Sequence, residues 1–255
     1  MSVPRKELDD MHRTLVLPDR VRRVVSLVPS LTEAIAASER GLLVGATQWC
    51  THPGDLDVVR VRGTKNPDVR RIVELAPDLV VANKEENREL DVRRLTEAGI
   101  AVWVTVVEDV EGALRSLDRL FTAALRAAVP DWLVSARRQL SGPVPEPSRC
   151  AVVCVWRDPW MVVGGRTFAT DLLARAGVGN IYRAHPDRYP TVALADLRAA
   201  RPDLVILPDE PYVFTADDGP EAFPGQAVRL VSGRMLTWYG PSLATAVPIL
   251  TTQLR

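Results

Sequence analysis

Aromatic side chains concentrate in the segments where strands are expected to end. Phe, Trp and Tyr make up only 5% of the 255 residues, yet residues 156–160 (WRDPW) and 237–241 (TWYGP) each place two of them among turn-forming residues. Such rings offer rigid, amphipathic contact area for a large flat ligand, or they fill the core beneath their loops. The aromatic candidates for ligand binding are Trp49, Trp156, Trp160, Tyr189, Tyr212, Trp238 and Tyr239.

Three polar residues near expected strand ends are also candidates for ligand binding. Arg157 could contact a ligand carboxylate or phosphate, although solvated surface charge is the simpler interpretation. Glu85 follows an expected strand and could face a ligand or pair with an arginine at the rim. Ser30 follows the first apolar strand of the alternating pattern and forms, with Glu33, the S-x-x-E pattern of a helix capping box.

The sequence contains no recognisable metal-binding or catalytic motif. His12, His52 and His185 have no H-x-H or H-E-x-x-H spacing, and the three cysteines form no C-x-x-C pair. No G-x-S-x-G, P-loop or G-x-G-x-x-G motif follows the first strand. We therefore predict a non-enzymatic protein with no catalytic residue, no protein-built metal site and no intrinsic cofactor. His185 or Tyr189 could still reach the axial position of a metal held in a macrocycle.

Charge and hydropathy narrow the possible partners and compartments. Lys plus Arg and Asp plus Glu are both 32, so the net charge is zero, which argues against a nucleic-acid binder with a strongly basic face. The sequence has no uninterrupted run of about 18 apolar residues, so it predicts no membrane span. The first twenty residues lack the apolar run of a secretory signal. This favours the cytoplasm, whereas a trimmed or mis-started N-terminus would favour an extracytoplasmic protein.

The elements that position these candidates form two α/β stretches. Short β-branched runs alternate with helical segments, a pattern that predicts parallel sheets flanked by helices. We expect an N-terminal tail (1–21), a first α/β lobe (22–109), linking helices with a Pro-rich connector (110–148) and a second α/β lobe (149–255). The lobes should be Rossmann-like, with a ligand cleft between them, because ligands of open sheets bind beyond the carboxyl ends of the strands.

An internal repeat supports two similar lobes. Residues 77–80 and 202–205 both read Pro-Asp-Leu-Val, 125 positions apart. Each string ends a helical segment and precedes a buried strand. One such match is weak, because helix–Pro-Asp–strand links are common. The same string at the same place in two alternations favours a repeated architecture.

The order of several longer motifs resembles the class III periplasmic binding proteins, the helical-backbone metal receptor group, and is nearest to the cobalamin receptors. The resemblance covers residues 22–254. It rests on RVVSLVPSLTEAIAA (23–37), LLVGATQWCTHP (42–53), RRIVELAPDLVVANKEEN (70–87), FATDLLARAGVGNIY (168–182) and TWYGPS (237–242). It implies a substrate-binding protein of the ABC-importer type for a large metal chelate. Cobalamin or another corrinoid would be the first candidate, and haem or a ferric siderophore the next.

Two departures from this resemblance bear on the partner. The resemblance implies one surface carboxylate on each lobe that docks on arginines of an ABC permease. The first would fall within Asp68–Ile72, where the chain has Arg70 and Arg71, and the second at Ala195, beside Asp196. Like charges oppose docking, so these residues argue against a permease partner. The alternatives are a cytoplasmic corrinoid- or tetrapyrrole-handling protein, an enzyme that reuses the cleft, or a scaffold for another protein.

Overall fold

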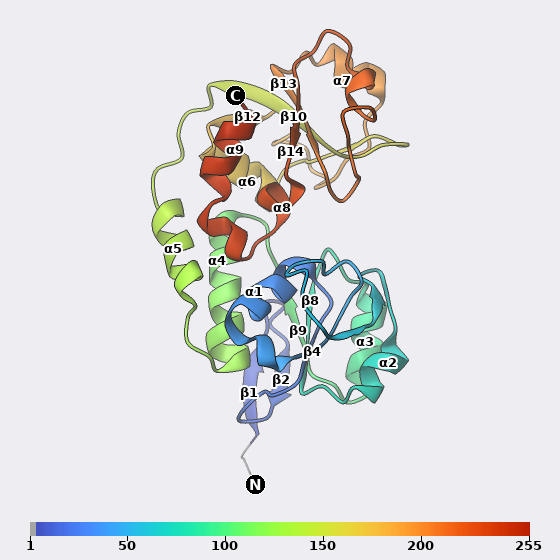
Figure 1. The fold of residues 1–255 in the computed structure, drawn as a ribbon, viewed down its shortest axis with the longest axis vertical. Helices are drawn as coiled ribbons and strands as arrows, with labels where there is room; N and C mark the ends of the chain where they lie inside the picture. The colour runs from blue at the N-terminus through green and yellow to red at the C-terminus, as the bar shows by residue number, and fades with distance from the viewer. Residues whose placement is uncertain (1–3) are drawn as a thin grey trace. The chain divides into compact units, whose positions relative to one another are not determined.

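The computed structural model describes residues 4–255 and divides into two compact α/β units (Figure 1). Unit 1 contains the described chain up to Val107, together with Gly112–Val134 and Tyr239–Pro241. Unit 2 contains Glu108–Glu111, Ser135–Trp238 and Ser242–Arg255. Two helices, α4 (Val110–Arg119) and α5 (Asp131–Leu140), each begin in one unit and end in the other. The predicted class, two α/β lobes with parallel sheets and a helical connection, is therefore confirmed.

Unit 1 is built on a five-stranded parallel sheet with the order β5-β4-β3-β8-β9. Its strands are β3 (Val24–Ser26), β4 (Leu43–Ala46), β5 (Val59–Arg60), β8 (Leu79–Asn83) and β9 (Val102–Thr105). The helices that alternate with them are α1 (Pro29–Glu39), α2 (Val69–Glu74) and α3 (Glu89–Glu97). The central strands β3 and β8 are apolar runs because both of their faces are buried.

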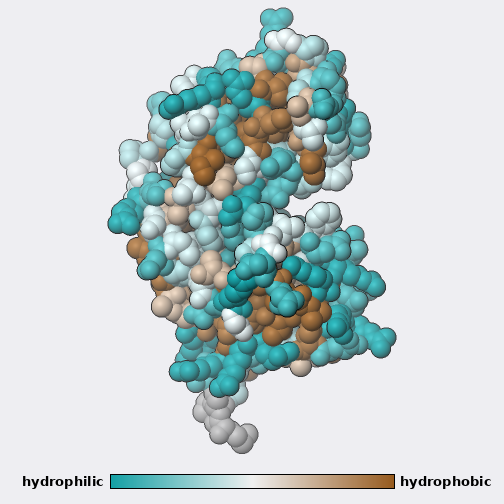
Figure 2. Space-filling view, viewed as in Figure 1, coloured by the Kyte–Doolittle hydropathy of each residue, from teal (hydrophilic) through white to brown (hydrophobic). Residues whose placement is uncertain are grey.

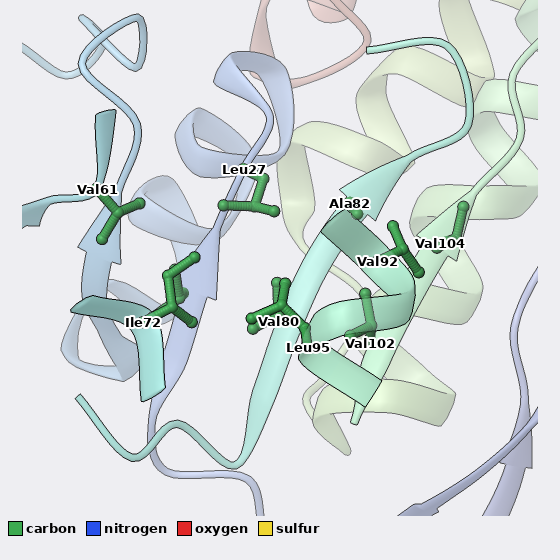
Figure 3. Close-up of a cluster of buried hydrophobic side chains, with 10 residues drawn as sticks. Leu27, Val61, Ile72, Val80, Ala82, Val92, Leu95, Val102 and Val104 are labelled. Carbon is green, nitrogen blue, oxygen red and sulfur yellow. The ribbon is translucent and has the colours of Figure 1, made fainter. Parts of the chain in front are cut away.

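The core of unit 1 connects the sheet to α2 and α3. Val80 of β8, Val102 of β9 and Leu95 of α3 belong to one buried cluster, and Figure 3 shows their side chains pointing toward one another. Ile72 extends the same cluster to α2. This packing fixes the strands, and therefore the place where Asn83 ends β8 and the candidate loop begins.

Unit 2 contains a second sheet with the path β11-β10-β13-β14, and β12 pairs with the first half of β10. Only β11 is antiparallel to its neighbour. The strands are β10 (Arg149–Trp156), β11 (Met161–Val162), β12 (Val178–Asn180), β13 (Leu204–Pro208) and β14 (Val228–Val231). The helices are α6 (Phe168–Arg175), α7 (Leu194–Ala199), α8 (Gly233–Thr237) and α9 (Ala246–Gln253).

The Pro-Asp-Leu-Val repeat has the same structural role in both units. The Asp78 carboxylate accepts hydrogen bonds from the backbone amides of Arg22 and Arg23, just before β3. The Asp203 carboxylate accepts one from the backbone amide of Cys150, in β10. In each case the aspartate precedes a strand and binds the neighbouring strand near its start. The repeated residues thus fix the register of two adjacent strands, which explains why the string recurs.

The N-terminal residues depart from the sequence interpretation, which placed a tail over residues 1–21. Within the described part, β1 (Arg5–Leu8) and β2 (Thr14–Leu17) pair as an antiparallel hairpin. The buried Asp9 organises its turn, because its carboxylate accepts hydrogen bonds from the backbone amides of Met11 and Arg13. The hairpin is too short to have shown a clear alternating pattern.

Several predicted boundaries also shift. The expected capping box at Ser30 and Glu33 does not form: Val28 is the N-cap residue and makes no side-chain cap, and Pro29 is the first residue of α1. Proline suits that position because its ring fixes a helical φ and it lacks an amide hydrogen. The linking helix α4 continues as a π-helical turn, Leu120–Leu125. The C-terminal residues form a 3-10 turn (Pro241–Ala244) and α9.

Candidate functional site

The strongest candidate surface in unit 2 is a cluster of aromatic rings at the end of β10. Trp156 meets Tyr212 edge to face, with 5.5 Å between ring centroids. Tyr212 lies 4.6 Å from Phe214, and Phe214 stacks on Trp160 at 5.9 Å and 10°. Phe223 closes the far side of Trp160 at 5.2 Å. Trp160, Phe214 and Phe223 are buried, so they form a rigid base beneath the two outer rings.

The outer part of this cluster is open to solvent. Trp156 is 42% exposed and Val213, next to Tyr212, is 64% exposed. Figure 2 shows hydrophobic surface on each unit as separate patches bordered by hydrophilic side chains. An exposed tryptophan supported by buried rings loses little conformational entropy when a ligand stacks on it, which suits it to ligand binding.

Arg157 holds the cluster together. Its guanidinium lies 5.3 Å from the ring centroid of Trp160 and forms ion pairs with Asp218 and with Glu221, the latter at 2.7 Å. The hydroxyl of Tyr212 donates to the other oxygen of Asp218 at 2.7 Å. Arg157 was predicted to contact an anionic ligand group. In this structure its charge is instead matched by two carboxylates of the same unit.

The ionisation of these groups follows from their contacts. The hydrogen bonds from Tyr212 and Arg157 hold the pKa of Asp218 below its usual range. The hydrogen bond from Arg157 lowers the pKa of Glu221 in the same way. The hydrogen bond to Asp218 raises the pKa of Tyr212. At neutral pH the cluster therefore contains a charged arginine, two carboxylates and a neutral phenol.

Tyr189 belongs to a separate loop of unit 2, whose position depends on two glycines. The amide of Gly164 donates to the carbonyl of Arg188 at 2.8 Å. A Cβ on Gly164 would lie 2.2 Å from the Asp187 carbonyl oxygen, and one on Gly165 would lie 2.6 Å from the Arg183 carbonyl oxygen. The two glycines thus allow the loop to approach the chain closely. Tyr189 remains 41% exposed.

Trp238 and Tyr239 are both buried in this structure. Trp238 caps the short helix α8 in unit 2. Tyr239 belongs to unit 1, where its hydroxyl lies 3.2 Å from Oε1 of Glu86. Burial and the nearby charge of Glu86 raise the pKa of Tyr239 well above its usual range. A Cβ on Gly240 would lie 3.0 Å from the carbonyl oxygen of Ser30, so this segment packs on the first turn of α1.

Trp49 and Glu85 lie on two strand-end loops of unit 1. Trp49 follows β4 and is 59% exposed, and its ring nitrogen would lie 3.2 Å from a Cβ on Gly63. Glu85 is half-buried, and its amide donates to Oδ1 of Asn83 at 2.8 Å. Lys65 donates to the backbone carbonyl of Glu85. Both loops are therefore held by hydrogen bonds or close packing.

The structure brings together only some of the predicted residues. Trp156, Arg157, Trp160 and Tyr212 form one cluster, and Ser30 and Tyr239 meet in unit 1. Sequence reasoning gave no role to the residues that complete the cluster, which are Phe214, Asp218, Glu221 and Phe223. The sequence contained one signal for these four residues, because they all fall within twelve positions of Tyr212.

The described residues, 4–255, contain no group of three or more His, Cys, Asp or Glu side chains that could hold a metal ion. Within the same range, no helix has the length and hydropathy to cross a membrane.

The two surfaces that the resemblance linked to docking carry mixed charge. On α2, Arg70 and Arg71 both pair with Glu74, at 3.3 and 3.1 Å, and all three side chains are exposed. On α7, Ala195 and its neighbour Asp196 are exposed. The surface of α2 thus contains a carboxylate, but its two arginines leave a net positive charge.

Two α/β units, each with a mainly parallel sheet and connected by helices, are the fold of the two-lobed periplasmic binding proteins. No family model matches the chain. Over 195 residues the chain is 24% identical to the vitamin B12-binding protein of Photorhabdus laumondii, which covers 72% of this chain and 70% of that protein.

Two solved structures share the fold. The periplasmic vitamin B12-binding protein BtuF of Vibrio cholerae is 18% identical, with a TM-score of 0.73 over 92% of this chain and 96% of that chain. The periplasmic heme-binding protein RhuT of Roseiflexus sp. RS-1 is 19% identical, with a TM-score of 0.73 over 92% and 98%. The predicted resemblance to the class III, helical-backbone group is confirmed by these similarities.

Proposed function

We propose that this protein binds a large metal chelate, with cobalamin or another corrinoid as the first candidate and haem or a ferric siderophore next. The observation that carries the proposal is the aromatic cluster of unit 2, in which Trp156 and Tyr212 stand on a base of buried rings. The names of the similar proteins support the same ligand classes, since they include vitamin B12-binding and heme-binding proteins.

The cluster would act by burial and stacking rather than by covalent chemistry. Three aromatic side chains that each contribute about 1–3 kcal/mol supply about 3–9 kcal/mol, so micromolar affinity also requires contacts from other residues to offset the cost of association. The protein would bind the macrocycle at its periphery. In unit 2 the contacts would come from the strand-end loops that contain Trp156 and Tyr189.

Calorimetric titration of the purified protein tests the proposal directly. Cyanocobalamin, haemin and a ferric hydroxamate siderophore are titrated in parallel. We expect saturable one-to-one binding to at least one of them, with cyanocobalamin tightest. Absence of heat and of spectral change with all three would overturn the proposal and favour an enzyme or a protein-binding scaffold.

A pair of variants tests the surface itself. Trp156→Ala should weaken binding of the preferred chelate at least about tenfold, because it removes an exposed ring from the cluster. Leu230→Ala is the matched control, since Leu230 on β14 is also 42% exposed. Equal affinities of the two variants would show that the chelate does not use this cluster.

An ABC permease is the expected partner for a substrate-binding protein, but the net positive surface of α2 favours a second candidate function. That function is handling of a corrinoid or tetrapyrrole in the cytoplasm. Fractionation of cells that express the complete gene separates the two proposals. Recovery from the envelope or periplasm supports import, and recovery with cytoplasmic markers supports handling.

A further inference from the structure

The two segments that form the aromatic cluster of unit 2 carry an excess of negative charge. These segments, Trp156–Trp160 and Tyr212–Phe223, contain one arginine against four carboxylates, which leaves a formal charge of −3. The carboxylates belong to Asp158, Asp217, Asp218 and Glu221.

The single cation of the cluster is already engaged. Arg157 forms ion pairs with Asp218 and Glu221, and its guanidinium lies near the ring of Trp160. A ligand carboxylate that approached Arg157 would have to compete with both of these side chains. Asp158 also lies 3.6 Å from Nε of Arg157, but its side chain is 85% exposed, and Asp217 is exposed as well, so neither carboxylate is shielded by burial.

The cluster therefore combines apolar contact area with repulsion of anions. Trp156 and Val213 offer exposed apolar atoms, while the neighbouring carboxylates make a second negative charge unfavourable there. We propose that this surface selects chelates whose face toward unit 2 is neutral or cationic, and that it discriminates against chelates that present carboxylates there. This inference rests on the proposed function and names the charge class of its ligand.

The inference separates the candidate chelates by chemistry. The peripheral acetamide and propionamide groups of an intact corrinoid are uncharged, its one anionic phosphodiester lies in the nucleotide loop, and hydroxamate iron complexes can be neutral or cationic. Haem carries two propionates that are ionised at neutral pH. Corrinoids and hydroxamates would thus be accepted at this face. Haem would be accepted only with its propionates turned away from unit 2.

A matched pair of ligands tests the inference with the full protein. Cyanocobalamin is compared with its separate monocarboxylic acid isomers, in which one peripheral amide is hydrolysed. We expect at least one isomer to bind about tenfold more weakly than cyanocobalamin at low salt, because it places a carboxylate against the acidic surface. The difference should narrow at 1 M NaCl, where the screening length falls to about 3 Å.

Variants of Asp158 and Asp217 test whether these carboxylates cause the difference in affinity between the amide and acid ligands. In the double variant D158N/D217N the ratio between the amide and acid ligands should approach one, while the pairs of Arg157 with Asp218 and Glu221 are kept. Glu146→Gln, in the exposed connector between α5 and β10, is the control and should leave the ratio unchanged.

A failure of the charge selection can be distinguished from a failure of the proposed chelate binding. If all acid isomers bind as tightly as cyanocobalamin, or if the double variant does not change the ratio, the charge selection is wrong although chelate binding stands. If no chelate binds, the proposed function itself fails.

Discussion

The hydroxyl of Tyr212 donates a hydrogen bond to Asp218, with 2.7 Å between Oη and Oδ2, and the same carboxylate forms an ion pair with Arg157. One aspartate thereby fixes an aromatic ring and a guanidinium that come from different loops. The ring of Tyr212 in turn meets Trp156. The orientation of the exposed aromatic surface thus depends on a small ionic network within unit 2.

This network should keep its ionisation state over a wide pH range. The pKa of Asp218 and that of Glu221 are lowered, so their stabilising contacts are complete above about pH 4 and are lost as pH falls through the lowered values. The pKa of Tyr212 is raised, so its hydrogen bond to Asp218 is complete below about pH 10 and is lost as pH rises through the raised pKa. We expect chelate affinity to be constant between about pH 5 and pH 9.

The measurement is tryptophan fluorescence and chelate affinity as functions of pH, for the native protein and for Asp218→Asn. Below about pH 9 the native protein should show a change in fluorescence only in the acid range under about pH 4, and the variant should show a smaller change there because only Glu221 still titrates. A transition near neutral pH that Asp218→Asn abolishes would contradict this assignment.

Arg157 should increase the affinity for the chelate although its charge is already paired with Asp218 and Glu221. Arg157→Met keeps part of the aliphatic stem but removes the ion pairs and the contact with Trp160. We expect cyanocobalamin to bind about three- to tenfold more weakly, because Tyr212 and Trp160 lose their common anchor. Near-ultraviolet circular dichroism of the aromatic residues should decrease as well.

The control for this variant is Arg93→Met on α3, which removes an exposed pair with Glu97 in unit 1. Its affinity and aromatic spectrum should match those of the native protein. If Arg157→Met behaves like Arg93→Met, the ionic network does not organise the binding surface.

Local patterns in the sequence were sufficient to predict most of the fold. The alternation of short apolar runs with helical segments predicted parallel sheets flanked by helices, and β8 and α3 are two continuous runs of that pattern. The two Pro-Asp-Leu-Val strings indicated a repeated unit because Asp78 and Asp203 make the same strand-start contact. Such features depend on neighbouring residues and so leave a signal in the sequence.

Features that depend on distant residues were missed. The pairing of Arg157 with Asp218 and Glu221 joins side chains more than sixty positions apart. Charged residues in a loop look the same in sequence whether they are solvated or paired. The N-terminal hairpin was missed for the same reason, since the contacts of Asp9 with Val104 depend on the folded sheet.

The glycines that precede α6 should be sensitive to a single methyl group. In Gly164→Ala the new Cβ would lie 2.2 Å from the Asp187 carbonyl oxygen and 3.0 Å from Cδ of Pro190. We expect a loss of about 1–3 kcal/mol in the free energy of unfolding, because backbone atoms must shift to relieve the overlap. Displacement of this loop should also weaken chelate binding through Tyr189.

Thermal unfolding and calorimetric binding measure these two effects. Gly142→Ala is the control, because nothing lies within 4 Å of a Cβ at that position in the connector. Equal melting temperatures for the two variants would mean that the loop does not pack against Gly164 as the structure shows.

The N-terminal hairpin should contribute to the stability of unit 1 through Asp9. Its carboxylate is fully buried, binds the amide and guanidinium of Arg13, and accepts a hydrogen bond from the amide of Val104 at 3.3 Å. Asp9→Asn replaces one acceptor oxygen by an NH2 donor and leaves Arg13 without its charged partner. We expect a loss of about 2–4 kcal/mol in urea unfolding. The exposed Asp57→Asn should lose less than about 0.5 kcal/mol, and similar losses in both variants would show that the hairpin is not held against β9.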